Sequence, residues 1–312
     1  MMDLDSVLGS LTTWEVVLNL VTVVLLPIEL VWLHRSGRLD RQRGREMVAS
    51  GVQFLPLLVT SIVSTAAWFA VFRGVEALVP WEIGLTPWTV ALAIIGADFL
   101  YYWEHRSEHR VNGLWSLYHS VHHSSPVYDQ STAYRLSAFD GTIGTVFLVP
   151  LVLVGFPAAL VVAAAGVVVG YQTWIHTETV RRLPRMVEWW FNTPSHHRVH
   201  HGTNPEYIDK NYGGILIIWD RVFRTFEPER APVTYGLTTQ IGNTRWIDAQ
   251  IFEVRNMIRS LGRASSWAQR LAILLRPPGW VAHPASSGPH GDQHIAAASP
   301  PMRQITSERS GT

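Results

Sequence analysis

Four long apolar stretches dominate the chain, and short polar segments separate them. They cover residues 16–33, 48–72, 86–103 and 141–175. About 20 apolar residues are needed to cross a hydrocarbon core of about 30 Å. The first three stretches therefore predict transmembrane helices, and a buried helix of a soluble protein is the alternative for the first.

The fourth stretch has no charged residue and is too long for one crossing. Pro157 follows Gly155 and Phe156 near its middle, and proline interrupts a helix interior. The pattern predicts a helical hairpin that turns at residues 155–157. Because the first arm is short, a pair of full crossings and a re-entrant hairpin are both open.

An arginine-rich segment lies between the first two apolar stretches. Residues 35–45 contain five arginines. Basic residues concentrate in cytoplasmic loops, so this segment is expected in the cytoplasm, with an ordinary solvated charge run as the alternative. Two intervening crossings return the chain to the same side after residue 103. The polar segments that follow, up to the hairpin and after it, are therefore expected on the cytoplasmic side as well.

The C-terminal part has a different character. Apolar residues recur at helical spacing at Ile251, Val254, Ile258 and Leu261, with arginines on another face. This pattern indicates an amphipathic helix on the membrane surface, or a helix packed on the core. Residues 281–312 are rich in Pro, Ser, Gly and Ala, which predicts a disordered tail.

Composition favours one membrane-embedded unit over two soluble domains. Hydrophobic residues make up 47% of the chain and charged residues 16%. The net charge of +1 implies no nucleic-acid partner. The absence of cysteine excludes disulfides, iron–sulfur clusters and thiolate metal ligands. Lys210 is the single lysine among 25 basic residues, a bias typical of a GC-rich bacterial genome, so we expect a bacterial plasma membrane protein.

Nine histidines fall into groups with regular spacing. They are the pair His105 and His109, the triplet His119, His122 and His123, the single His176, and the triplet His197, His200 and His201. Residues three or four apart share a helix face, so each H-x2-H-H triplet is expected to converge on one side of a turn. Imidazole binds iron, zinc, copper and nickel. Nine nitrogens are too many for one ion, and two six-coordinate ions would keep about three positions for water or an oxidant.

Four other polar residues are candidates for supporting roles. Asp98, Glu178 and Asp209 are expected to orient ligand rings by hydrogen bonds, with helix capping or ion pairing as the alternative for each. His196 adjoins His197, but neighbours on a helix point about 100° apart. We therefore expect His196 outside the ligand set, near the metals or the substrate.

The histidine-bearing segments resemble those of the fatty acid hydroxylase and sterol desaturase superfamily of membrane di-iron oxygenases. The similar phrases are DFLYYWEHR, LYHSVHHSSPVYDQSTAYR, YQTWIHTE, NTPSHHRVHHGTNPEYIDKNYGGILIIWDRVFRTF and the late PPGW, within residues 85–280. They are most similar to the alkylglycerol monooxygenase branch, and this resemblance supports His176 as a ligand. The expected fold is an all-α integral membrane protein: three transmembrane helices, the apolar hairpin and a cytoplasmic helical cap that holds the dimetal site. The expected division is transmembrane helices at 1–85, a fatty acid hydroxylase-like domain at 86–280 and the tail.

The resemblance implies an iron-dependent monooxygenase that uses O2 to hydroxylate a lipid C–H bond. The lipid would be an alkylglycerol ether, a sterol, a carotenoid or a fatty acyl chain, and desaturation is a close variant. Electrons would come from an external reductase or carrier, with tetrahydropterin implied for the alkylglycerol branch. The alternative is a non-redox membrane hydrolase or metal-binding scaffold that holds zinc, because imidazole ligation alone permits zinc.

Overall fold

The computed structural model describes residues 2–280, whose regular secondary structure is helical apart from two isolated β-bridges. The predicted tail at 281–312 lies outside the described residues. The helices are α1 Leu4–Arg35, α2 Arg41–Glu76, α3 Pro87–Arg110, α4 Asn112–Leu114, α5 Ser120–His122, α6 Val149–Val154, α7 Ala158–Thr173, α8 Arg185–Trp190, α9 Pro194–His200, α10 Ile218–Val222, α11 Trp246–Arg263 and α12 Trp267–Leu275. The all-α prediction is confirmed for the part of the chain that is described.

Two helices, α1 and α2, are long and apolar enough to cross a membrane by length and composition. Each begins at an aspartate whose carboxylate accepts a backbone N–H, Asp3 for α1 and Asp40 for α2. Because Asp40 caps α2, the helix starts inside the segment predicted as an arginine-rich loop. That part of the prediction is wrong: the loop is reduced to residues 36–40, and the first turns of α2 carry Arg41 and Arg45.

The third apolar stretch becomes α3, which is longer than predicted. A reciprocal capping box between Thr86 and Thr89 starts it, with Pro87 at the first helical position. The helix continues to Arg110, so both His105 and His109 project from its last two turns. A single rigid element thus joins the apolar part of the molecule to the histidine-rich part.

The fourth apolar stretch forms the predicted hairpin. Its first arm is a 3₁₀ turn, Gly144–Leu148, followed by α6 with six residues. The chain reverses at Gly155, whose φ of 109° suits glycine, and α7 starts after Pro157. At about 1.5 Å per residue, α6 is too short to cross about 30 Å, which favours a re-entrant arm over a full crossing.

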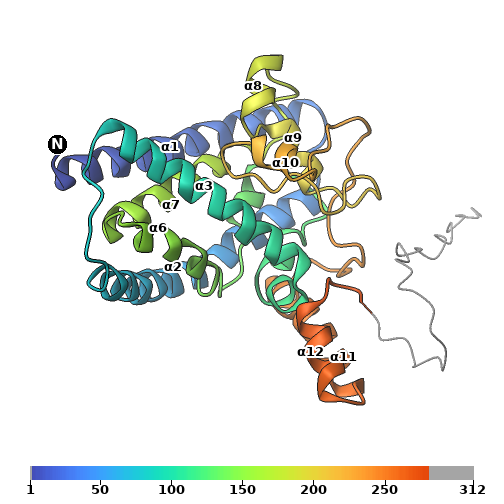
Figure 1. Cartoon of the computed structure of the whole chain (residues 1–312). Helices are drawn as coiled ribbons and strands as arrows, with labels where there is room; N and C mark the ends of the chain where they lie inside the picture. Colours follow the sequence, from blue (N-terminus) through green and yellow to red (C-terminus); the bar gives the residue numbers. More distant parts are fainter. Residues whose placement is uncertain (1, 281–312) are drawn as a thin grey trace, which may run out of the picture.

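The hairpin fills the space between the long helices. Figure 1 shows α6 and α7 (green) enclosed by α1, α2 and α3, and α7 packs against all three. The shared apolar core includes small side chains that let the helices approach closely: Ala93, Ala97, Ala158, Ala164, Val161 and Val168. This core fixes where the chain leaves α7 and enters the segment that carries His176.

Two amphipathic helices, α11 and α12, complete the described chain (Figure 1). The inner side of α11 packs on the turn around His119 and on α2. Its Gln250 donates to the carbonyl of Leu136 and accepts from the N–H of Ala138. The outer side leaves Ile258 59% exposed. The alternative of a helix packed on the core describes its inner face, and placement of the outer face on the membrane surface stays a prediction. The short helix α12, capped by Ser266, was not predicted.

Candidate metal centre

The nine histidines assemble into two groups. The five-histidine group comprises His105, His109, His119, His123 and His200, and the four-histidine group comprises His122, His176, His197 and His201. Within each group the candidate ligand atoms lie within 4.8 Å of one another. The expectation that each triplet converges on one side is wrong, because each triplet supplies both groups. The groups therefore adjoin, and the rings of His123 and His201 stack with centroids 4.4 Å apart.

Different elements deliver these histidines to one place. The pair comes from the end of α3, and the second triplet comes from α9 and the residue after it. The first triplet begins at His119, the last residue of a π-helical turn, Trp115–His119. Such wide turns are frequent at functional sites, and they rotate the next side chains relative to a regular helix. His176 follows the end of α7 and belongs to the four-histidine group.

Backbone carbonyls fix the orientation of four rings. The contacts are His105 Nδ1 to the oxygen of Tyr212 at 2.9 Å, His122 Nδ1 to Arg135 at 3.2 Å, His176 Nδ1 to Gln172 at 2.8 Å and His200 Nδ1 to Lys210 at 3.1 Å. A carbonyl oxygen only accepts, so each Nδ1 carries the proton. Each Nε2 consequently turns a lone pair towards its group, as in known metal-binding histidines.

The resulting lone pairs face one another. The Nε2 atoms of His122 and His176 are 3.2 Å apart, and those of His105 and His119 are 2.9 Å apart. In the His122–His176 pair both Nδ1 atoms donate to backbone carbonyls, so no proton remains for a hydrogen bond between the two Nε2 atoms. Two facing lone pairs repel unless a cation lies near both. The donor set therefore fits bound metal ions.

Burial keeps these imidazoles neutral. It lowers the pKa of His105 to about 3 and that of His122 to about 4. For the other seven the pKa is also lowered, first by burial and then by the neighbouring histidines. A neutral imidazole has a free lone pair at physiological pH, as metal ligation requires.

An acidic cluster of Glu104, Glu108 and Asp140 lies beside the five-histidine group. Glu108 Oε2 is 3.0 Å from Nδ1 of His119, which orients that ring. Burial raises the pKa of all three carboxyls. Repulsion from Asp140 raises the pKa of Glu104 further, and repulsion from Glu104 and then from Asp140 raises that of Glu108. A nearby cation would favour their charged forms, so the cluster can balance the charge that neutral imidazoles leave. Sequence reasoning missed Glu108, although it shares the last turns of α3 with both histidines.

The carboxylates chosen from the sequence behave differently from one another. Asp209 comes closest to the expected role, since its Oδ1 is 3.8 Å from Nδ1 of His109 and it also pairs with Arg110. Glu178 instead pairs with Arg38 at 2.6 Å. The hydrogen bonds that Asp98 accepts come from the backbone of residues 215–216 and from a tryptophan. The ion-pair alternative therefore describes Glu178, and these hydrogen bonds of Asp98 go to the loop rather than to a histidine ring.

Asp98 and Asp220 together hold the loop behind His105. Asp220 accepts from the N–H of Tyr212 at 2.8 Å and from that of Gly213 at 2.7 Å. These bonds position the Tyr212 carbonyl that orients His105. Gly213 is required for this turn, because a Cβ there would lie 2.5 Å from the oxygen of Leu216. Asp220 lies in the phrase IIWDRVF, where no histidine spacing drew attention to it.

His196 lies in neither group. Its Nε2 is 3.2 Å from Glu188 Oε2, and its Nδ1 is 3.2 Å from the oxygen of Phe191. Hydrogen bonds from His196 and Ser195 lower the pKa of Glu188 to about 2 against the opposing effect of its burial. These contacts tie α9 to α8, so His196 supports the helix that presents His197 and His200.

Comparison with known proteins gives consistent results. Residues 90–225, which include all nine histidines, match the family model described as fatty acid hydroxylase. The chain is 38% identical over 262 residues to the alkylglycerol monooxygenase of Danio rerio and 36% identical over 265 residues to that of Homo sapiens, which in both cases is 83% of this chain. It spans only 57% and 58% of those two relatives.

A bacterial relative is more distant. The ornithine lipid hydroxylase OlsE of Rhizobium tropici is 26% identical over 229 residues, which are 70% of this chain and 66% of that protein. No solved structure matches the chain.

Proposed function

We propose that this chain, which matches the fatty acid hydroxylase family model and is similar to alkylglycerol monooxygenases, is a membrane-bound di-iron monooxygenase that hydroxylates a lipid C–H bond with O2. One observation carries the proposal: two adjoining groups of buried, neutral imidazoles with their Nε2 lone pairs turned inwards. A closed structural zinc site needs only four ligands, so nine favour two ions with open positions.

The nine histidines are the proposed ligands of two iron ions. Iron would supply the redox chemistry that activates O2, which zinc lacks. The carbonyls of Tyr212, Arg135, Gln172 and Lys210 orient the rings, and Glu108 orients the ring of His119. Burial of the rings excludes bulk water from the ligand shell, which protects the centre from side reactions.

The proposed substrate is a glyceryl ether lipid, hydroxylated on the carbon next to the ether oxygen. The product is a hemiacetal, which separates into an aldehyde and a glycerol. The names of the most similar relatives support this choice, and the partial coverage of those relatives leaves sterols, carotenoids and acyl chains as variants. Electrons would come from an external donor, for which tetrahydropterin is the candidate from the alkylglycerol branch.

The proposed location is a bacterial plasma membrane. We place α1, α2 and the first part of α3 across the bilayer, with the α6–α7 hairpin re-entrant between them. Both histidine groups then lie at the cytoplasmic end, on the same side as residues 36–40. There the centre can receive a lipid from the bilayer and electrons from the cytoplasm.

The test combines metal content with oxygen labelling. Protein purified anaerobically from iron-supplemented cells should hold two irons per chain, and cells that express it should convert glyceryl ethers into products that carry one atom from ¹⁸O₂. The control is a double variant, His122→Ala with His200→Ala, which removes one ligand from each group and should abolish both signals. Full activity with one tightly held metal, or with zinc alone, contradicts the proposal.

A further inference from the structure

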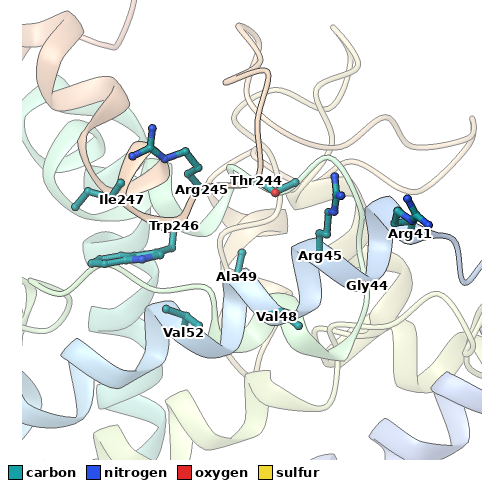
Figure 2. Close-up of a pocket in the computed structure, with 10 residues that line it drawn as sticks. All are labelled: Arg41, Gly44, Arg45, Val48, Ala49, Val52, Thr244, Arg245, Trp246 and Ile247. Atoms are coloured by element: carbon teal, nitrogen blue, oxygen red, sulfur yellow. The ribbon is translucent and has the colours of Figure 1, made fainter.

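A cleft rimmed by arginines lies where α2 meets the segment before α11. Its volume is about 750 Å³, and it is lined by apolar side chains of α2, by Trp246 and Ile247, and by Arg41, Arg45 and Arg245. Figure 2 shows Arg45 and Arg245 on either side of Thr244, with Trp246 lying along α2 beside Val52. The cleft therefore combines a cationic rim with an apolar floor, and neither feature takes part in the metal centre.

The rim arginines differ from their neighbour Arg43. Arg43 is buried, donates to the carbonyl of Tyr128 and pairs with Asp129 at 3.0 Å. Arg41 and Arg45 are exposed, and among the described residues neither has a carboxylate within ion-pair distance. Arg245 has only a long contact to Asp248, at 3.7 Å, and stays 74% exposed. The positive charge of the rim is thus largely uncompensated.

A continuous apolar stripe descends α2 from this rim. Val48, Leu55, Val59 and Ile62 are 67%, 59%, 67% and 72% exposed, and Val52 lies among them. Their alternating spacing of four and three residues keeps them on one side of the helix, in line with Arg41 and Arg45. At about 1.5 Å per residue the stripe is about 21 Å long, more than the about 15 Å depth of one leaflet.

The position of the cleft matches the depth of lipid phosphates. Since α2 is a candidate membrane span that begins at Arg41, its first turns lie where a span enters the interface. Tryptophan favours the same level, and Trp246 closes the cleft there. An anionic head group at the rim and a chain on the stripe would each contact complementary surface.

We propose that this cleft binds one anionic phospholipid, with its phosphate between Arg41, Arg45 and Arg245 and one acyl chain along the α2 stripe. A second cleft of about 670 Å³ shares Arg41, Arg45 and Thr244 and reaches Ser124, which directly follows His123. The proposed lipid site is therefore separated from the metal centre by the second cleft. This proposal does not depend on the reaction that the centre catalyses.

The test counts lipids on the full-length protein by native mass spectrometry in detergent. Titration with phosphatidylglycerol should leave one lipid bound per chain, about tenfold more tightly than phosphatidylcholine or diacylglycerol. The double variant Arg41→Gln with Arg45→Gln should weaken this binding about tenfold or more. The matched control is Arg259→Gln, an exposed arginine of α11 outside the cleft, which should bind as the unaltered protein does.

A second variant tests the apolar half without changing charge. Val48→Trp fills the floor of the cleft at an exposed position, so it should fold normally and still lose the tightly bound lipid. Thermal unfolding of every variant checks the fold. Equal phosphatidylglycerol binding by the double variant and the unaltered protein overturns the proposal, as does equal loss in Arg259→Gln. Unchanged binding by Val48→Trp, or equally tight binding of free glycerol phosphate, overturns the assignment of the chain to the stripe.

Discussion

Replacing Glu108 should weaken the binding of one of the two proposed metal ions and leave the binding of the other unchanged. Glu108 Oε2 is 3.0 Å from Nδ1 of His119, which belongs to the five-histidine group. In the four-histidine group the rings of His122 and His176 are held by backbone carbonyls instead. A side-chain substitution at Glu108 therefore removes ring orientation from one group only.

The expected magnitude follows from that contact. Loss of a hydrogen bond behind a ligand typically costs 10–100-fold in metal affinity, or about 1.4–2.7 kcal/mol. Glu108→Gln keeps the shape and an accepting oxygen but loses the charge, so we expect metal affinity to fall about tenfold. Glu108→Ala loses both, and since its side chain is only 12% exposed, water replaces it poorly. We expect metal affinity to fall about a hundredfold in this variant.

The assay is equilibrium release of ferrous iron to a chelator under anaerobic conditions, which should resolve two steps per chain. One step should shift in the Glu108 variants and the other should not. Glu178→Gln is the matched control, because Glu178 is 15% exposed but pairs with arginines. Two unshifted steps, two steps shifted equally, or the same shift in the control would refute the role of Glu108.

Three further predictions concern the ligands, pH and topology. His176→Ala should lose activity and part of the metal, whereas His196→Ala should keep its metal, and metal analysis with turnover of both purified variants decides this. Burial holds the pKa of His105 near 3, so between pH 6.5 and 3 the unfolded chain binds a proton that the native chain does not. The free energy of unfolding of the metal-free protein should therefore fall by about 2 kcal/mol between pH 6.5 and 5 because of this histidine. A melting temperature that stays constant or rises on acidification contradicts this. Cysteines at Asp40 and Pro126 should be protected from an impermeant reagent in intact cells, and labelling of either from outside contradicts the cytoplasmic placement.

The helices follow from the sequence where local physics decides their limits. Apolar length, the Gly155–Pro157 turn and the helical spacing from Ile251 predict α1, α2, α3, the hairpin and α11. The predicted helix limits are wrong where a capping side chain, rather than apolar composition, decides where a helix begins. Asp40 starts α2 among arginines that look like a loop, and Ser266 starts a short helix with too few residues for a clear period.

The supporting carboxylates could not be predicted in the same way. Asp98 and Glu108 lie on the same helix, and each is near a histidine in the sequence. Asp98 is turned towards the distant loop at residues 215–216, whereas Glu108 contacts His119 because the chain reverses direction after α3. Both outcomes depend on packing between elements. Periodicity reports which side chains share a helix face, and it carries no information on the partner that this face meets.

The division of each triplet between the two groups does follow from helix geometry. Residues four apart on a helix differ by about 40° in direction, and residues three apart by about 60° in the opposite sense. In both triplets the first and last histidines, four apart, share a group, and the middle one, three residues after the first, joins the other group. His105 and His109, also four apart, stay together. The additional histidine in H-x2-H-H points about 100° away from the last one, which is the direction that a second, adjoining ion would require. The motif itself therefore argues for two adjoining metal ions.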